Sequence, residues 1–196
     1  MREDELISVI MSTYNESSKE LQKSVESILN QTYKKLELII INDNPTNERL
    51  SEDLEYIQKR DNRVRIYANE KNIGLVKSLN KALTYATGRY IARMDADDIS
   101  TADRLEAQIG SLKTGKFDLA GGNIQLIDEG DHQFGELNFP TDSKKIAFFM
   151  RWGSCLPHPT WLGKKEVFEH LMGYRDALYC EDYDFLLRAL ASGCRL

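Results

Sequence analysis

The chain has 196 residues, of which 41% are hydrophobic and 29% are charged. These proportions are ordinary for a globular protein, and a chain of this length buries enough apolar surface to fold without disulfide or metal cross-links. The formal net charge is −5 and no block of basic residues stands out, so the charge balance gives no case for a nucleic-acid partner.

Cysteine usage and the N-terminal sequence bear on location. The chain has three cysteines, Cys155, Cys180 and Cys194, and no pair has C-x-x-C spacing. An odd number without such spacing favours a protein of the reducing cytosol over one held by disulfide bonds. The N-terminus lacks the basic start and apolar core of a signal peptide. No apolar run reaches the ~20 residues that a membrane helix requires. These features predict a cytoplasmic protein.

The first two thirds of the chain alternate runs typical of strands with runs typical of helices. Apolar, β-branched runs predict five strands, over residues 6–11, 36–41, 64–67, 90–94 and 118–128. Apolar residues at helical spacing predict four helices: one from the capping pair Ser17 and Glu20, one around 50–57, one over 75–86 that ends before Gly88, and one over 102–112 capped by Ser100 or Thr101. This alternation favours a mostly parallel α/β sheet with right-handed crossovers.

The last third is less regular. It holds a predicted helix over 141–151, a loop over 153–160, a short helix over 164–172 and a final helix that begins near Asp182. Gly173 and Gly193 follow the two last helices, where a left-handed residue is common. Residues 194–196 look like the beginning of another strand, so we expect the chain to be part of a longer protein.

Ligands of parallel α/β sheets bind beyond the carboxyl ends of the strands. The polar loops after Met11, Ile41 and Met94 would therefore gather on one edge. In the last of these loops, residues 95–98 place three carboxylates within four positions, a crowding of like charge that a divalent cation would offset. The alternative is a solvated acidic turn in which Asp98 or Ser100 caps the next helix. Spacing alone does not separate the two.

Other polar residues at element ends have two interpretations each. Asp43 either forms an Asx-turn before a proline or hydrogen-bonds a base or ribose. Tyr14 and Asn15 would stack on and bond a flat ring. Glu181 and Asp182 start the last helix, where an acid is favoured by the helix dipole. The functional alternative there is a general base.

His158, Arg93 and the two tryptophans are further candidates. His158 lies between two prolines and either binds metal or phosphate or has a structural role. Arg93 lies inside a predicted strand, where a charge must be paired or face a site, so pairing with a nearby Asp competes with phosphate binding. Trp152 and Trp161 either pack in the core or line an acceptor groove.

Together these segments resemble glycosyltransferase family 2, whose members have the GT-A fold. The resemblance rests on motifs that occur in the family's order over nearly the whole chain, at residues 7–16, 38–43, 72–75, 86–98, 157–160 and 181–184. The Arg93 variant and the His-Pro-Thr segment are similar to those of bacterial enzymes that build exopolysaccharide, capsule or lipopolysaccharide.

The resemblance implies an inverting transfer of a sugar from a nucleotide diphosphate sugar, usually a UDP-sugar, to a hydroxyl of a glycan or glycolipid acceptor. It implies a single GT-A catalytic domain over 1–196, with a donor-binding half at 1–128 and an acceptor-binding half at 129–196. Mn²⁺ or Mg²⁺ would hold the donor diphosphate. The implied protein is cytoplasmic, and its attachment to the inner face of the plasma membrane and its oligomeric state are left open.

By position, the resemblance also implies individual roles. Asp182 would be the catalytic base and Asp97 the metal ligand, with Asp95 and His158 as further candidate ligands. Trp161 and Glu181 would contact the acceptor. Contacts to the donor would come from eight residues: Thr13, Tyr14, Asn15, Glu16, Asp43, Arg93, Asp95 and Ala96.

The chain departs from the family pattern at one loop, and two other classes of function compete. Asn42 stands where the family usually has an Asp, and Asn44-Pro45 where Gly-Ser is common, so contacts to the base are expected to differ there. A nucleotidyltransferase would want a Gly-rich phosphate loop after the first strand, and residues 12–16 hold no glycine. A non-catalytic nucleotide-binding relative would not need to retain both Asp97 and Asp182.

Overall fold

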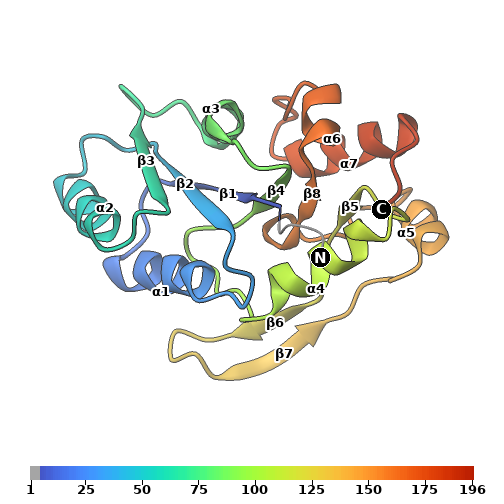
Figure 1. The fold of residues 1–196 in the computed structure, drawn as a ribbon, viewed down its shortest axis with the longest axis horizontal. Helices are drawn as coiled ribbons and strands as arrows, with labels where there is room; N and C mark the ends of the chain where they lie inside the picture. Colours follow the sequence, from blue (N-terminus) through green and yellow to red (C-terminus); the bar gives the residue numbers. More distant parts are fainter. Residues whose placement is uncertain (1–4) are drawn as a thin grey trace.

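The computed structural model describes residues 5–196, in which six strands form one mixed sheet (Figure 1). The strand order is β3-β2-β1-β4-β8-β5. Strands β1 (Ile7–Thr13), β2 (Leu36–Asn42), β3 (Val64–Ala68) and β4 (Tyr90–Arg93) pair in parallel, whereas β8 (Leu162–Lys164) is antiparallel to both β4 and β5 (Leu119–Ala120). The predicted α/β class with a mostly parallel sheet is confirmed.

Helices cover both faces of this sheet, and each face has its own core. One core takes apolar residues from α1 (Ser18–Leu29), α2 (Glu48–Arg60) and α4 (Arg104–Lys113). The other takes them from α3 (Leu75–Tyr85), α5 (Ser143–Phe149), α6 (Lys165–His170) and α7 (Glu181–Ala191). Neighbouring strand residues alternate between the two, with Leu38 and Ile40 in the first core and Ile39 and Ile41 in the second. The central strands are mostly apolar because both their faces are buried, and the buried Ser8, Glu37 and Arg93 in them are hydrogen-bonded or ion-paired within the fold.

Several local predictions are confirmed by the geometry of helix ends. The backbone N–H of Glu20 donates to Ser17 Oγ (3.2 Å) and that of Ser17 donates to Glu20 Oε2 (2.8 Å), which is the predicted capping box at α1. Gly173 and Gly193 have φ of +72° and +85°, as expected for residues that follow a helix.

Gly88 has a different role from the predicted one. Helix α3 ends at Tyr85, and Ala86 leaves it with an extended backbone. A Cβ on Gly88 would lie 2.6 Å from the carbonyl oxygen of Leu6 and 2.7 Å from the backbone nitrogen of Ser8. The position is therefore restricted by close approach to β1, and the prediction that Gly88 terminates α3 is wrong.

The predicted cap of α4 is also wrong. The helix begins at Arg104 after Asp103, and no side chain caps it with a hydrogen bond. Ser100 is occupied elsewhere, since its backbone N–H donates to Ser27 Oγ (3.0 Å) and its hydroxyl accepts from Gln31 Nε2 (3.2 Å). These bonds tie the loop before α4 to α1.

The single strand predicted over 118–128 is two strands in different sheets. After β5 the chain leaves the main sheet, and β6 (Ile124–Ile127) pairs with β7 (Gln133–Leu137) in a separate antiparallel hairpin. Gly121 lies between them, and a Cβ there would be 2.7 Å from Leu156 Cδ2. Residues 194–196 form no strand, although the Arg195 carbonyl accepts from the backbone of Asp118 and Leu119. Among the described residues, no helix is long and apolar enough to cross a membrane.

Candidate functional site

A cavity of about 550 Å³ opens at the carboxyl edge of the parallel strands. Its lining comes from the loops after β1, β2 and β4 and from the loop that leads into α3. The lining residues are Ser12, Thr13, Tyr14, Glu16, Asp43, Asn72, Gly74, Leu75, Asp95, Asp97 and Asp98. The prediction that the polar loops gather on one edge of the sheet is confirmed.

The loop after β1 is folded around the carboxylate of Glu16. Its Oε2 atom accepts from Thr13 Oγ1 (2.5 Å) and from the backbone N–H groups of Tyr14 (2.8 Å) and Asn15 (3.1 Å). This arrangement leaves the Tyr14 side chain 45% exposed at the cavity. Asn15 is exposed but does not line the cavity, so three of the four donor-binding residues predicted in this loop do line it.

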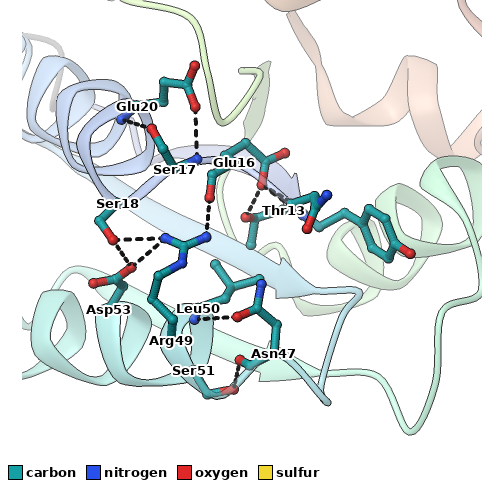
Figure 2. A network of polar contacts seen from close by, with 12 residues as sticks. Thr13, Glu16, Ser17, Ser18, Glu20, Asn47, Arg49, Leu50, Ser51 and Asp53 are labelled. Carbon is teal, nitrogen blue, oxygen red and sulfur yellow. Dashed lines mark hydrogen bonds and ion pairs between the residues drawn. The ribbon is translucent and has the colours of Figure 1, made fainter.

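Arg49 on α2 supports the same loop and has no counterpart in the sequence predictions. Figure 2 shows its guanidinium between α1 and the β1 loop. Nη2 donates to the Glu16 carbonyl oxygen (2.6 Å), while Nη1 donates to Ser18 Oγ (2.8 Å) and to Asp53 (3.1 Å). The sequence gives no signal of this contact, because two of the three partners, Ser18 and Glu16, lie 31 and 33 residues before Arg49.

Asp43 is a buried residue of the cavity lining that links two loops by hydrogen bonds. Its Oδ1 atom accepts from Asn69 Nδ2 and from the Ile73 backbone (2.8 Å each), and Oδ2 accepts from the Gly74 backbone (2.9 Å). It thereby holds the loop before α3 against the end of β2. The Asx-turn considered for Asp43 is made by Asn42 instead, whose Oδ1 atom accepts from the Asn44 backbone (2.9 Å).

The acidic cluster after β4 carries negative charge that the fold only partly offsets. Asp95 pairs with Arg93 Nη2 at 2.5 Å. Partial burial and the neighbouring Asp95 raise the pKa of Asp97. Burial, then Asp95 and Asp97, raise the pKa of Asp98 to about 6, against the opposing charges of Arg93 and Arg104. Asp98 does not cap α4, so the interpretation as a helix cap is wrong.

This charge fits a cation that is held together with a ligand. Among residues 5–196, no group of three or more His, Cys, Asp or Glu side chains is arranged to hold a metal ion on its own. Mg²⁺ and similar ions commonly take one or two carboxylates from the protein and complete their shell with water and substrate phosphates. Asp95 and Asp97 at the cavity wall suit that mode of binding.

Arg93 and Ala96 lie behind the cavity wall. Arg93 is 1% exposed and Ala96 2% exposed, and neither lines the cavity. Their predicted donor contacts therefore gain no support from the cavity lining, and they stay predictions. Arg93 instead orients Asp95, and its Nε and Nη1 atoms are buried without a hydrogen-bond partner among the described residues.

His158 and Trp161 are also core residues, which corrects their predicted roles. His158 Nε2 lies 3.0 Å from the Tyr174 hydroxyl, and burial followed by the charge of Arg93 lowers the pKa of His158 well below its ordinary value. His158 does not line the cavity, so a metal role is not supported. Trp161 is fully buried and donates from Nε1 to the Leu156 carbonyl (3.0 Å), so it cannot contact an acceptor. Trp152 is the exposed tryptophan.

The first turn of α7 carries the predicted base. Asp182 and Glu181 are half-buried, and Asp182 Oδ1 accepts from the Tyr183 backbone (2.7 Å). Burial raises the pKa of Tyr174, and the charges of Glu181, Asp182 and Asp95 raise it further. Both halves of the chain therefore bring carboxylates near the same buried hydroxyl. Asp182 does not itself line the cavity.

The fold and the cavity define an α/β protein with an acidic ligand site at the carboxyl edge of a parallel sheet. Residues 8–172 match the family model described as glycosyl transferase family 2. The chain is 38% identical over 187 residues to the O-antigen biosynthesis glycosyltransferase WbnJ of Escherichia coli, a match that covers 95% of this chain and 72% of that protein. An uncharacterized glycosyltransferase of Methanocaldococcus jannaschii is 36% identical over 191 residues, with 95% and 65% covered.

Solved structures show the same fold at low identity. The mannosyltransferase PcManGT from Pyrobaculum calidifontis, in complex with GDP-Man and Mn²⁺, has a TM-score of 0.75 at 18% identity, and the match covers 96% of this chain and 53% of that one. The Staphylococcus aureus protein TarS, in complex with UDP, has a TM-score of 0.71 at 21% identity, with 93% and 54% covered. The chain belongs to glycosyl transferase family 2 and has the GT-A fold, and it spans about half to two thirds of the length of most of these proteins.

Proposed function

We propose that this chain is the catalytic region of an inverting glycosyltransferase that takes its sugar from a nucleotide diphosphate sugar. The observation that carries the proposal is the incompletely offset acidic cluster of Asp95, Asp97 and Asp98, which shares one cavity with Tyr14 and Asp43. A diphosphate with its cation would meet the carboxylates, and a nucleoside would meet the other wall. Family membership supports the same assignment.

The donor nucleoside is assigned to the side of the cavity built by the β1 and β2 loops. The half-exposed Tyr14 ring offers a flat surface on which a base would stack. Asp43 fixes the loop at residues 72–74, so that this wall of the cavity is formed before a ligand arrives. We propose UDP as the nucleotide. Among the structural relatives, one is described with UDP and one with GDP-Man, so the comparison supports a nucleoside diphosphate more than a particular base.

Asp97, with Asp95 beside it, is proposed to hold Mn²⁺ or Mg²⁺. When bound, such an ion would neutralise charge on the departing diphosphate. Arg93 holds the Asp95 carboxylate at 2.5 Å and so keeps it at the cavity wall. The description of PcManGT with Mn²⁺ supports a divalent cation, and the lack of a complete protein cage among residues 5–196 agrees with a shared shell.

Asp182 is proposed as the general base. It would accept the proton of the acceptor hydroxyl as that oxygen attacks the anomeric carbon, while the bond to the diphosphate breaks on the opposite face. One displacement of this kind inverts the configuration. Glu181, the neighbouring acid on α7, is proposed to contact the acceptor. We propose a hydroxyl of a glycan or lipid-linked glycan as acceptor, which the O-antigen role in the name of WbnJ supports.

A calorimetric titration with UDP tests the donor site. We expect UDP to bind with Mn²⁺ present, and more weakly without it. Asp97→Asn should lower the affinity at least about tenfold, because even an indirect partner of a metal ligand is typically worth that much. Asp103→Asn is the matched control, since Asp103 is exposed six residues further on and makes no side-chain cap. Binding that is absent, or the same without metal, would count against the proposal.

A further inference from the structure

Three large aromatic side chains are exposed where α5 ends. Phe148 is 51% exposed, Phe149 49% and Trp152 69%. The three rings form one group, because the Phe148 centroid lies 4.8 Å from that of Trp152 and 5.6 Å from that of Phe149. Scattered apolar residues are normal on a protein surface, but a contiguous group of this size marks an interaction site.

The same segment is basic in an otherwise acidic protein. Lys144, Lys145 and Arg151 are exposed, and the Arg151 guanidinium lies 5.8 Å from the Phe148 ring centroid. The stretch 143–165 contains no Asp or Glu, whereas the whole chain has a net charge of −5. Neither Lys144 nor Lys145 pairs with an acidic side chain among residues 5–196. We call Lys144, Lys145, Phe148, Phe149, Arg151 and Trp152 the aromatic–cationic face.

The inner side of α5 anchors this face to the fold. Ile146 and Met150 are 5% and 1% exposed and belong to the core shared with α7. The Met150 carbonyl accepts from the Tyr183 hydroxyl at 2.5 Å, and Tyr183 follows Asp182. Figure 1 shows α5 and α7 at the same end of the molecule, away from α2. The aromatic–cationic face therefore lies on a helix that packs against the core. The hydrogen bond from Tyr183 to Met150 links this helix to the first turn of α7.

We propose that the aromatic–cationic face docks on an anionic lipid surface. Aromatic rings are favoured at the level of lipid headgroups, and exposed lysines and arginines are attracted to a negatively charged leaflet. A second acidic protein would satisfy the cations but not call for three solvent-facing rings. This inference does not depend on the proposed chemistry. If that chemistry also holds, docking would bring Asp182 toward a membrane that presents a lipid-linked acceptor.

The two tryptophans allow a direct test with the unaltered chain. Trp161 is fully buried and Trp152 is 69% exposed, so a change in emission on adding vesicles reports on Trp152. We expect a blue shift and co-sedimentation with vesicles of phosphatidylcholine plus phosphatidylglycerol. Vesicles of phosphatidylcholine alone should give a much smaller effect, and added salt should reverse the binding because the attraction is screened.

Charge and ring variants have matched controls within the chain. Lys144→Glu with Lys145→Glu should lower vesicle affinity by about 20-fold or more, since each cation near an anionic leaflet contributes roughly fivefold. The control is Lys34→Glu with Lys35→Glu, another exposed neighbouring pair. Trp152→Ser should also weaken binding, whereas Phe134→Ser, at the same 69% exposure, should not. A thermal melt of each variant checks that it folds.

Three outcomes would overturn the proposal. One is no binding to anionic vesicles by the unaltered chain. Another is an equal loss of vesicle affinity in the Lys34 and Lys35 control, which would show that the net charge of the chain, and not this face, determines binding. The third is self-association that Trp152→Ser relieves, without vesicle binding, which would assign the face to a second copy of the chain. None of these outcomes bears on UDP binding, which is measured without lipid.

Discussion

Two aspartates beside strands of the main sheet have pKa values shifted in opposite directions. Asp118 at the start of β5 accepts from Lys164 Nζ (2.6 Å) and from Arg195 Nε and Nη2 (3.0 Å each). Burial alone would raise the pKa of Asp118, but the bonds from Arg195 and Lys164 outweigh it and hold the pKa well below its ordinary value. At Asp98, burial and the charges of Asp95 and Asp97 raise the pKa to about 6.

The difference separates a structural carboxylate from a candidate ligand site. Asp118 has its charge balanced by the fold and joins β5 to β8 and to Arg195. The cluster around Asp98 keeps an excess of negative charge, although a protein could offset it with one more basic residue. Titratable groups with shifted pKa values tend to gather at functional sites, so this cluster is a candidate ligand site. The predictions below test that distinction.

Helix α7 holds both kinds of carboxylate within one turn, one that is ion-paired and one that has no ion pair among the described residues. We expect the largest effect on turnover from a substitution here. Asp184 pairs with Arg188 Nε at 2.7 Å, whereas the Asp182 carboxylate accepts only from the neighbouring backbone among the contacts described. Asp182→Asn should lower turnover by ~10²–10⁴-fold, the usual contribution of a general base, with UDP affinity nearly unchanged. The measurement is release of UDP from a UDP-sugar with a glycan acceptor.

Asp184→Asn is the matched control for that substitution. It removes an ion pair between residues four positions apart in the helix, which contributes about 0.3–0.5 kcal/mol to the free energy of unfolding. Turnover should stay within a few-fold of that of the unaltered chain. Equal loss of turnover in both variants would mean that the helix, and not the Asp182 carboxylate, is being measured. Unchanged turnover in Asp182→Asn would remove it from the mechanism.

Asp118→Asn predicts the largest effect on stability. It weakens hydrogen bonds to two charged partners, so the free energy of unfolding should fall by about 1.5–3 kcal/mol at neutral pH. Because the folded pKa is depressed, the stabilisation is present above the unfolded pKa of about 3.9 and is lost as the pH falls through the folded pKa. Urea titrations should therefore show the variant and the unaltered chain converging in strong acid. A difference that does not depend on pH would refute the charge pairing.

Much of this fold could be predicted because its signals are local. Strands β1 to β4 are rich in apolar and β-branched residues, the α1 capping box is a four-residue pattern, and the site follows from where parallel strands end. The acidic loop was predictable as a candidate for the same reason. Of its two interpretations, the helix cap could be excluded only from the geometry of α4, which begins at Arg104 with no side-chain cap.

Several of the errors concern which distant segment a residue meets. Composition does not tell Trp152 from Trp161, although one is 69% exposed and the other fully buried. Gly88 follows a helix, yet its constraint is the backbone of β1 some 80 residues earlier. The strand predicted over 118–128 ends at Ala120, and Gly121, Gly122 and Asn123 separate it from β6, which pairs in another sheet. Long-range packing decides the roles of the two tryptophans and of Gly88, whereas the break after Ala120 carries a local signal in its two glycines.

We expect the smallest effect from Asp98→Asn, which tests whether the acidic cluster lowers the stability of the fold. The folded pKa of about 6 lies above the ordinary value of 3.8, so the folded state retains a proton that the unfolded chain releases between those values. Stability should fall as the pH rises through this window, and the full penalty should be present above about pH 6. The variant removes that penalty.

In thermal melts without metal, Asp98→Asn should therefore melt above the unaltered chain at pH 8, and the two should coincide below pH 4. The atoms packed around the Asp98 carboxylate raise its pKa, but the residue keeps contact with solvent, which screens the effect, so the increase should be modest. Asp103→Asn, five residues away on the same surface, should show no such growth with pH. If Asp98→Asn lowered the melting temperature at pH 8, the cluster would be offset by the fold in the way Asp118 is, and its charge would no longer argue for a cation and a diphosphate.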